Sequence, residues 1–111
     1  LDQVLFKPGS AALSSQGEKV LHKIAKEISK LGDGSIRVAG HTDSDPIKVN
    51  KQFSSNWHLS AVRAKQVVEL LEKSGVPGKR MYLAGFSYHQ PVDASKKSLN
   101  RRVEITLVKP N

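Results

Sequence analysis

The stretch from Val38 to Ala64, VAGHTDSDPIKVNKQFSSNWHLSAVRA, contains the residues around which the rest of the chain is organised. It begins as a short apolar run that stops at Gly40, continues as a polar loop rich in Ser, Asn, Asp and Pro, and then starts a helix. We expect Ser60 to be the N-cap of that helix, because a serine hydroxyl can accept a hydrogen bond from a first-turn amide. Strand end, loop and helix start should therefore form one polar edge.

Arg63 is unusual in this setting, since the first turn of a helix carries partial positive charge and normally attracts Asp or Glu. Asp43, at the start of the same loop, supplies an opposite charge. In one arrangement Arg63 and the helix amides bind a carboxylate while Asp43 binds an ammonium, so the ligand is an amino acid. Arg63 is then exposed, and Arg63→Ala should abolish binding at little cost in stability. In the other, the two residues form a partly exposed ion pair worth about 0 to 1 kcal/mol.

The remaining segments alternate between strand and helix patterns. Val4–Phe6 predicts a strand, and the Ser-x-x-Glu capping box at Ser15–Glu18 predicts the start of a helix. The apolar face of that helix is expected to be Val20, Leu21, Ile24, Ile28 and Leu31, with His22 on its flank. Further strands are expected at Ile36–Gly40, Met81–Ala84 and Val103–Leu107.

This β-α-β-α-β-β order predicts an α+β two-layer sandwich, with a mixed sheet and both helices on one face. Residues 1–111 are expected to form a single domain. The last strand can pair antiparallel with its predecessor, although the sequence leaves the strand order open.

The net charge, the cysteine content and the absence of catalytic motifs limit the functions that this chain can have. The net charge of +8 favours a polyanionic partner, and the absence of cysteine removes disulfides and thiolate zinc sites. His41 and Asp43 alone lack a third metal ligand, so we expect no metal or cofactor, and His41 should brace the loop. No serine nucleophile motif is present, which argues against an enzyme.

Nucleic-acid binding is the main rival from another class. Such a surface would need exposed aromatic residues interleaved with cations. The six aromatic residues form no such run, and the basic cluster of Lys96, Lys97, Arg101 and Arg102 is more typical of a solvated face. We expect Trp57 to pack under the central loop. Nucleic acid is therefore not expected as a partner.

Four blocks of the chain, in order and spacing, resemble the OmpA-like peptidoglycan-binding domain. They are Gly40–Asp43 (GHTD), Asn56–Ala64 with its L-S-x-x-R-A, Gly75–Arg80, and Asn100–Ile105 with its N-R-R. The resemblance covers about Val4 to Leu107. This chain departs from the family's G-x-G-E-x-x-P block, because the corresponding segment Gly85–Pro91 lacks the Glu.

The resemblance implies noncatalytic binding of the diaminopimelate of the peptidoglycan stem peptide. Asp43 and Arg63 would clasp its amino acid end, with Asn56 and Arg101 as supporting contacts. Asn100 and Arg102 would be structural, holding the last strand against the preceding loop.

Within this family, the loop from Thr42 to Ser60 is similar to that of the periplasmic domain of MotB-type flagellar stator proteins. This implies a periplasmic domain that anchors a membrane protein to the cell wall of a Gram-negative-type bacterium. The membrane would be contacted only through segments outside this chain, and the domain can form a homodimer. The alternative is an OmpA-like porin or a Pal-like lipoprotein tether.

Overall fold

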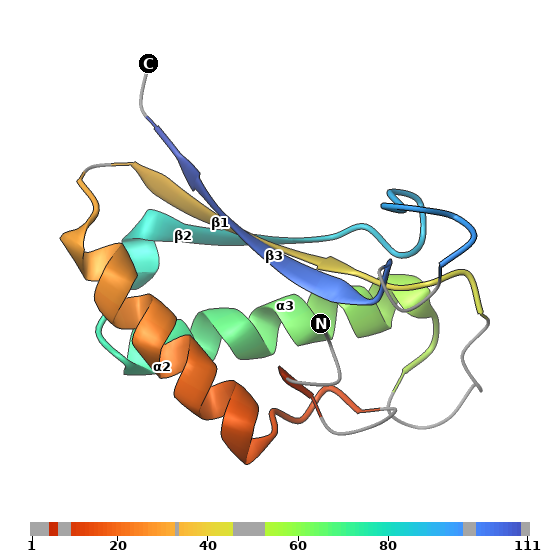
Figure 1. The fold of residues 1–111 in the computed structure, drawn as a ribbon, viewed down its shortest axis with the longest axis horizontal. Helices are drawn as coiled ribbons and strands as arrows, with labels where there is room; N and C mark the ends of the chain where they lie inside the picture. The colour runs from red at the N-terminus through yellow and green to blue at the C-terminus, as the bar shows by residue number, and fades with distance from the viewer. Residues whose placement is uncertain (1–4, 7–9, 33, 46–52, 97–99, 110–111) are drawn as a thin grey trace.

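The computed structural model describes residues 5–6, 10–32, 34–45, 53–96 and 100–109. Two helices lie against one face of a three-stranded sheet, so the expected α+β two-layer class is confirmed (Figure 1). The helices are α2 (Ser15–Lys30) and α3 (Asn56–Lys73), and the strands are β1 (Ser35–His41), β2 (Met81–Gly85) and β3 (Arg102–Val108). A 3-10 turn, η1 (Gly78–Arg80), leads into β2.

Strand β1 is the centre of the sheet, whose order is β2-β1-β3. It runs parallel to β2, with α3 in the crossover, and antiparallel to β3, so that Val38 faces Leu83 on one side and Ile105 on the other. The last strand therefore pairs with β1 rather than with its predecessor. Consequently the ends of β1 and β2 and the start of β3 meet at one edge of the sheet, at the right of Figure 1.

The expected strand at Val4–Phe6 is replaced, in its described part, by a single contact. Phe6 forms an isolated antiparallel bridge with Leu13, and Val4 lies outside the described residues. Leu5 O accepts from Ser14 N at 2.8 Å, and a Cβ on Gly17 would collide with the Leu5 backbone. This segment is therefore held against the start of α2 instead of joining the sheet.

Helix α2 is capped by Ser14, one residue before the expected capping box, and its Oγ accepts from Gly17 N at 2.9 Å. The apolar stripe points to the core as predicted through Leu21 and Ile28. Leu31 is instead exposed, because it is the C-cap residue and leaves the helix in an extended conformation.

Helix α3 begins at Asn56, with Ser55 as its N-cap, so the expected start at Ser60 is wrong by about one turn. Ser55 Oγ accepts from His58 N at 3.2 Å. The core-facing residues follow the predicted spacing, and the helices close over the sheet through fully buried side chains. These are Leu21 of α2, Ala64, Val67 and Leu71 of α3, and Val38 of β1.

Ser60 sits where the strand ends come closest to α3. A Cβ on Gly40 would collide with the Ser60 carbonyl, and one on Gly85 would lie 2.8 Å from Ser60 Oγ. The buried Ser60 hydroxyl donates to Trp57 O at 3.0 Å and accepts from Ser87 N at 3.1 Å. This close packing fixes the polar edge of the sheet against α3.

Candidate functional site

Asp43 lies just past the end of β1 and is 7% exposed. The main chain is fixed here, since Thr42 N donates to Ser87 O at 2.8 Å and Thr42 Oγ1 donates to Asp43 O at 2.9 Å. The carboxylate uses both oxygens: Oδ1 accepts from Asp45 N at 3.0 Å, and Oδ2 accepts from Arg101 Nη1 at 2.6 Å. Asp43 is therefore held in one orientation at the strand end.

The Asp43–Arg101 contact is a short, charge-assisted hydrogen bond. Its carboxylate side is nearly covered, whereas the Arg101 side chain is 30% exposed. Within the part of the chain that the structure describes, Asp43 pairs with Arg101 and not with Arg63. The ion pair between Asp43 and Arg63 that the sequence left open is therefore not formed.

Arg63 lies about two turns into α3, so the prediction that it is a first-turn cation is wrong. It is also buried, at 4% exposed, rather than a surface cation. Its Nε and Nη2 both donate to Ser10 O, at 3.2 and 3.1 Å, and the guanidinium lies 5.0 Å from the Phe6 ring centroid. Arg63 thus ties the N-terminal segment to α3.

Asn56 and Arg101 are both brought to the Asp43 loop. Asn56 opens α3, and its Nδ2 donates to Asp45 O at 3.1 Å. Because Asp45 N also donates to Asp43, three of the four predicted site residues belong to one connected set of hydrogen bonds. Arg63 bonds to Ser10 O instead, and its link to this set is that it lies on the same helix as Asn56.

Asn100 and Arg102 have the structural role that was expected for them. Asn100 is buried, and its Oδ1 accepts from the amides of Val92 and Asp93 at 2.8 and 3.2 Å. Arg102 Nη2 donates to Gln90 O at 3.0 Å. Together they hold the loop after β2 against the start of β3, next to Arg101.

His41 braces the same edge, as predicted. Its ring is buried and stacks on Phe86, with centroids 5.1 Å apart and an interplanar angle of 12°. Burial lowers the pKa of His41 below 6.5, and the nearby Arg102 lowers it further, while Glu104, 3.5 Å away, acts in the opposite direction. A hydrogen bond from Arg102 lowers the pKa of Glu104 below 4.5. His41 is therefore a packed, neutral side chain at neutral pH.

Trp57 does not pack under the loop as expected, because its side chain is 55% exposed. It stands beside His89, with ring centroids 5.1 Å apart, and His89 in turn lies 4.4 Å from Tyr88. The row lines a hollow of about 390 Å³ that also includes Ser44 and Asn56. The sequence carried no direct signal of this row, because Trp57 is far in the sequence from Tyr88 and His89.

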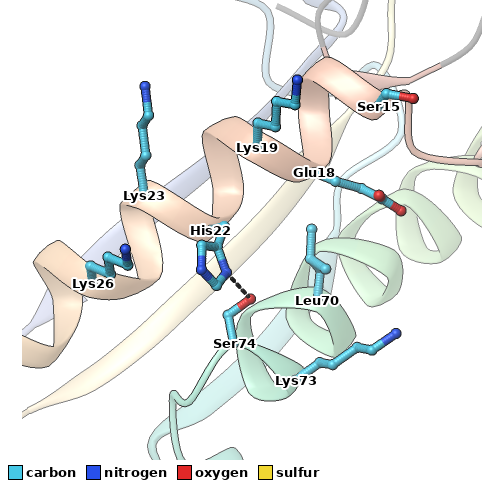
Figure 2. A pocket seen from close by; sticks show the side chains of 9 residues that line it. All are labelled: Ser15, Glu18, Lys19, His22, Lys23, Lys26, Leu70, Lys73 and Ser74. Carbon is cyan, nitrogen blue, oxygen red and sulfur yellow. Dashed lines mark hydrogen bonds between the residues drawn. The ribbon is translucent and has the colours of Figure 1, made fainter.

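A second hollow, of about 670 Å³, runs between α2 and α3 (Figure 2). His22 lies on its wall, with Nδ1 3.1 Å from Ser74 Oγ, in agreement with the expected helix-flank role. Figure 2 shows Lys19 and Lys23 extending from α2 away from the space between the helices, and Lys73 extending away from both, so the three ammonium groups do not converge on a shared centre. This groove is therefore a solvated basic surface and offers no focused anion site.

Among the described residues, no group of three or more His, Asp or Glu side chains is arranged to hold a metal ion. In the same part of the chain, no helix has both the length and the apolar character needed to cross a bilayer.

The chain is similar to known proteins over almost its whole length. A sequence model described as the OmpA family matches residues 5–104. Motility protein B of Bacillus subtilis is 36% identical over 116 residues, which cover 96% of this chain and 42% of that protein. The chain thus spans less than half the length of this relative.

Two solved structures are similar throughout. The periplasmic domain of Helicobacter pylori MotB gives a TM-score of 0.91 at 28% identity, covering 99% of this chain and 73% of that one. The cell wall anchor of the T6SS from Pseudomonas aeruginosa gives a TM-score of 0.84 at 35% identity, covering 97% and 77%.

Proposed function

Because the chain belongs to the OmpA family, we propose that it is a noncatalytic domain that binds peptidoglycan through the diaminopimelate of the stem peptide. Its similarity to Motility protein B, to a MotB periplasmic domain and to a cell wall anchor supports a role in fixing a membrane protein to the wall. The parent protein would then be a MotB-like stator subunit.

Recognition would use Asp43 at the polar edge and Arg63, which is buried on α3 and would have to exchange Ser10 O for the ligand. The Asp43 carboxylate would bind the ligand's ammonium, and Arg63 would bind its carboxylate. Asp43 now holds Arg101, so the incoming ammonium would replace that guanidinium and leave Arg101 available for the ligand's carboxylate. Arg63 now donates twice to the neutral carbonyl of Ser10, and a charged carboxylate is the stronger acceptor for the same fork.

Asn56 would act as a supporting contact. Its Nδ2 already donates to Asp45 O, two residues from Asp43, which brings the amide to the proposed site. The observation that carries the proposal is the family match across residues 5–104, in which the motif carboxylate Asp43 lies at the end of β1 beside Arg101 and Asn56.

The test is retention on purified peptidoglycan sacculi. We expect the chain to be retained and to be released by free diaminopimelate. DNA-cellulose serves as the comparison for the rival nucleic-acid function. Equal retention on DNA-cellulose, with no competition by diaminopimelate on sacculi, would overturn the proposal.

We further propose that the domain works on the periplasmic side of the membrane, with membrane contact made by segments outside this chain. A homodimer is part of the same proposal. Light scattering of the purified chain measures its mass directly, and a monomer at all concentrations would remove the dimer from the proposal.

A further inference from the structure

Helix α2 carries an exposed stripe of lysines on the side that faces away from the core. The stripe, called the lysine row, consists of Lys19, Lys23, Lys26 and Lys30. At 3.6 residues per turn, these positions fall within about 60° of one another around the helix axis and span about 16 Å of its length. The buried residues Leu21 and Ile28 lie on the opposite side of the helix. The lysine row therefore points directly into solvent.

The lysine row gathers positive charge that a helix normally neutralises. Like charges four residues apart destabilise a helix, whereas a Lys and a Glu at that spacing stabilise it. Helix α3 has the favourable arrangement, with Lys65 Nζ 2.8 Å from Glu69 Oε1. In the lysine row, Lys30 lies 3.4 Å from Glu27, and no described carboxylate forms an ion pair with the other three lysines. The row therefore breaks a local stability rule, which points to a role outside folding.

The charges of the row act together. Neighbouring lysines are about 4.5 to 6 Å apart along the helix axis, which is less than the Debye length of about 8 Å at physiological salt. The two acidic residues of the helix, Glu18 and Glu27, lie on either side of the row and not within it. The chain as a whole has a net charge of +8. The row is therefore a narrow band of positive potential on a basic protein.

The surface on both sides of the row is open. The hollow of about 670 Å³ between α2 and α3 is lined by Lys19, Lys23 and Lys26, and a further hollow of about 530 Å³ is lined by Lys23, Lys26 and Lys30. Figure 2 shows that Lys73, on α3, extends away from the lysines of α2. The cations of α2 are therefore arranged along a line and not over a plane or around one centre.

We propose that the lysine row binds a linear polymer of phosphate groups that carries no bases. Lysine is a compact point charge that can contact successive phosphates without fixed geometry. A dense line of negative charge gains affinity when its condensed counterions are released. Figure 1 shows α2 at the lower left and the polar edge of the sheet at the right, so the row is separate from the Asp43 site. The inference therefore goes beyond the proposed function and does not depend on it.

Three other anionic partners fit the row less well. Protein interfaces gain most of their affinity from covered Trp, Tyr and Arg side chains, and sites for single-stranded nucleic acid add aromatic rings for base stacking. The described residues that line the two hollows include no Trp, Tyr, Phe or Arg. A planar anionic bilayer would need cations from both helices on one plane, whereas Lys73 extends away from the row (Figure 2).

The test is a calorimetric titration of the 111-residue chain with linear inorganic polyphosphate. Poly-L-glutamate, a dT oligonucleotide and phosphatidylglycerol vesicles are the comparisons, each at the same concentration of negative charge. We expect polyphosphate to bind most tightly, with log K falling against log salt at a slope of about −3 for four lysine contacts. Absence of polyphosphate binding at about 50 mM salt, or tighter binding of any comparison, would overturn the inference.

The double variant Lys23→Gln/Lys26→Gln removes the centre of the row. We expect the salt slope to change from about −3 to about −1.5, because two of the four contacts are lost. Lys65→Gln/Lys79→Gln is the matched control, since it removes the same charge from exposed positions on α3 and η1. The control should keep the slope of the unmodified chain. Equal slopes of the two variants would show that net charge alone drives binding and would overturn the site.

Thermal melts at low salt separate binding from folding. Lys23→Gln/Lys26→Gln should melt at the same temperature as the unmodified chain or higher, because it relieves repulsion between like charges. A lower melting temperature would show that these lysines stabilise the fold and would contradict the inference.

Retention on sacculi separates the lysine row from the proposed function. Lys23→Gln/Lys26→Gln should be retained as well as the unmodified chain, and loss of its retention would overturn the separation of the two surfaces. A polyphosphate response without any retention on sacculi would keep the row and remove the proposed function. Retention without a polyphosphate response would do the reverse.

Discussion

Arg101 Nη1 donates a 2.6 Å hydrogen bond to Asp43 Oδ2, which joins the segment before β3 to the end of β1. The two residues are far apart in the sequence, and each comes from a different motif of the family. The bond shows that the anionic end of the polar edge already has a guanidinium partner. Ligand binding at Asp43 is therefore expected to be an exchange of cations rather than the filling of an empty position.

Asp43→Asn should abolish retention on sacculi, because an amide keeps an acceptor for Asp45 N but cannot neutralise an ammonium. Glu69→Gln is the control, since it removes the same charge from an exposed i,i+4 pair with Lys65 on α3. Retention is measured by pull-down at equal protein concentration. Full retention of Asp43→Asn would exclude the carboxylate as a binding group.

Arg63→Ala should lower the free energy of unfolding by about 1 to 3 kcal/mol, because Ser10 O loses both side-chain donors and Phe6 loses its cationic neighbour. The sequence alone predicted an exposed Arg63 whose replacement would change stability little, so the burial of Arg63 reverses that prediction. Lys65→Ala, on the solvent face of the same helix, should change stability by less than about 0.5 kcal/mol. Urea unfolding measures both, and an unchanged midpoint for Arg63→Ala would contradict the buried role.

Gly40→Ala should destabilise the chain by about 1 to 3 kcal/mol, because its new methyl group would collide with the Ser60 carbonyl. Gly32→Ala is the matched control, since a Cβ there would meet nothing within 4 Å. Thermal melts of the two variants give the comparison. Similar melting temperatures would mean that the strand end and α3 can separate at little cost.

Stability should fall as the pH drops below 6.5, in part through His41. Its pKa is lowered in the folded chain, so the unfolded chain takes up the proton first, and this contribution is complete only below the folded pKa. His41→Phe preserves the stack on Phe86 and cannot be protonated in this range. Between pH 7.5 and 5, the unmodified chain should lose unfolding free energy relative to His41→Phe, and parallel pH profiles of the two proteins would exclude His41. Loss through Glu104 belongs to a separate range below 4.5.

The sequence predicted the elements that have strong periodicity. Alternating apolar residues predicted the strands that contain Val38 and Ile105. Apolar residues at helical spacing predicted the helices that contain Leu21 and Leu71, because each pattern matches a face that must be buried. The start of α3 was misplaced because Ser55 and Ser60 are equally good caps by residue type. In the structure Ser55 is the cap, and Ser60 lies inside the helix with its hydroxyl bonded to Trp57 O and Ser87 N.

The sequence indicated which residues are candidates for the site but not which residues they contact. Charge type singled out Asp43 and Arg63, and the family motifs added Asn56 and Arg101. Their partners depend on contacts distant in sequence, such as Ser10 with Arg63 and Arg101 with Asp43, which no local pattern encodes. The aromatic row of Trp57, His89 and Tyr88 was missed for the same reason.

Strand β1 runs parallel to β2 and antiparallel to β3, which limits the positions at which the sequence of the domain can vary during evolution. Two connections reach the polar edge in the described part of the chain, one after β1 and one after β2, and Thr42 N of the first donates to Ser87 O of the second at 2.8 Å. Residues that anchor these connections, such as Ser87 and Asn100, are buried and are expected to stay, whereas exposed positions such as His89 and Val92 are free to change. The same scaffold can thereby carry binding surfaces of different chemistry while its interior stays the same.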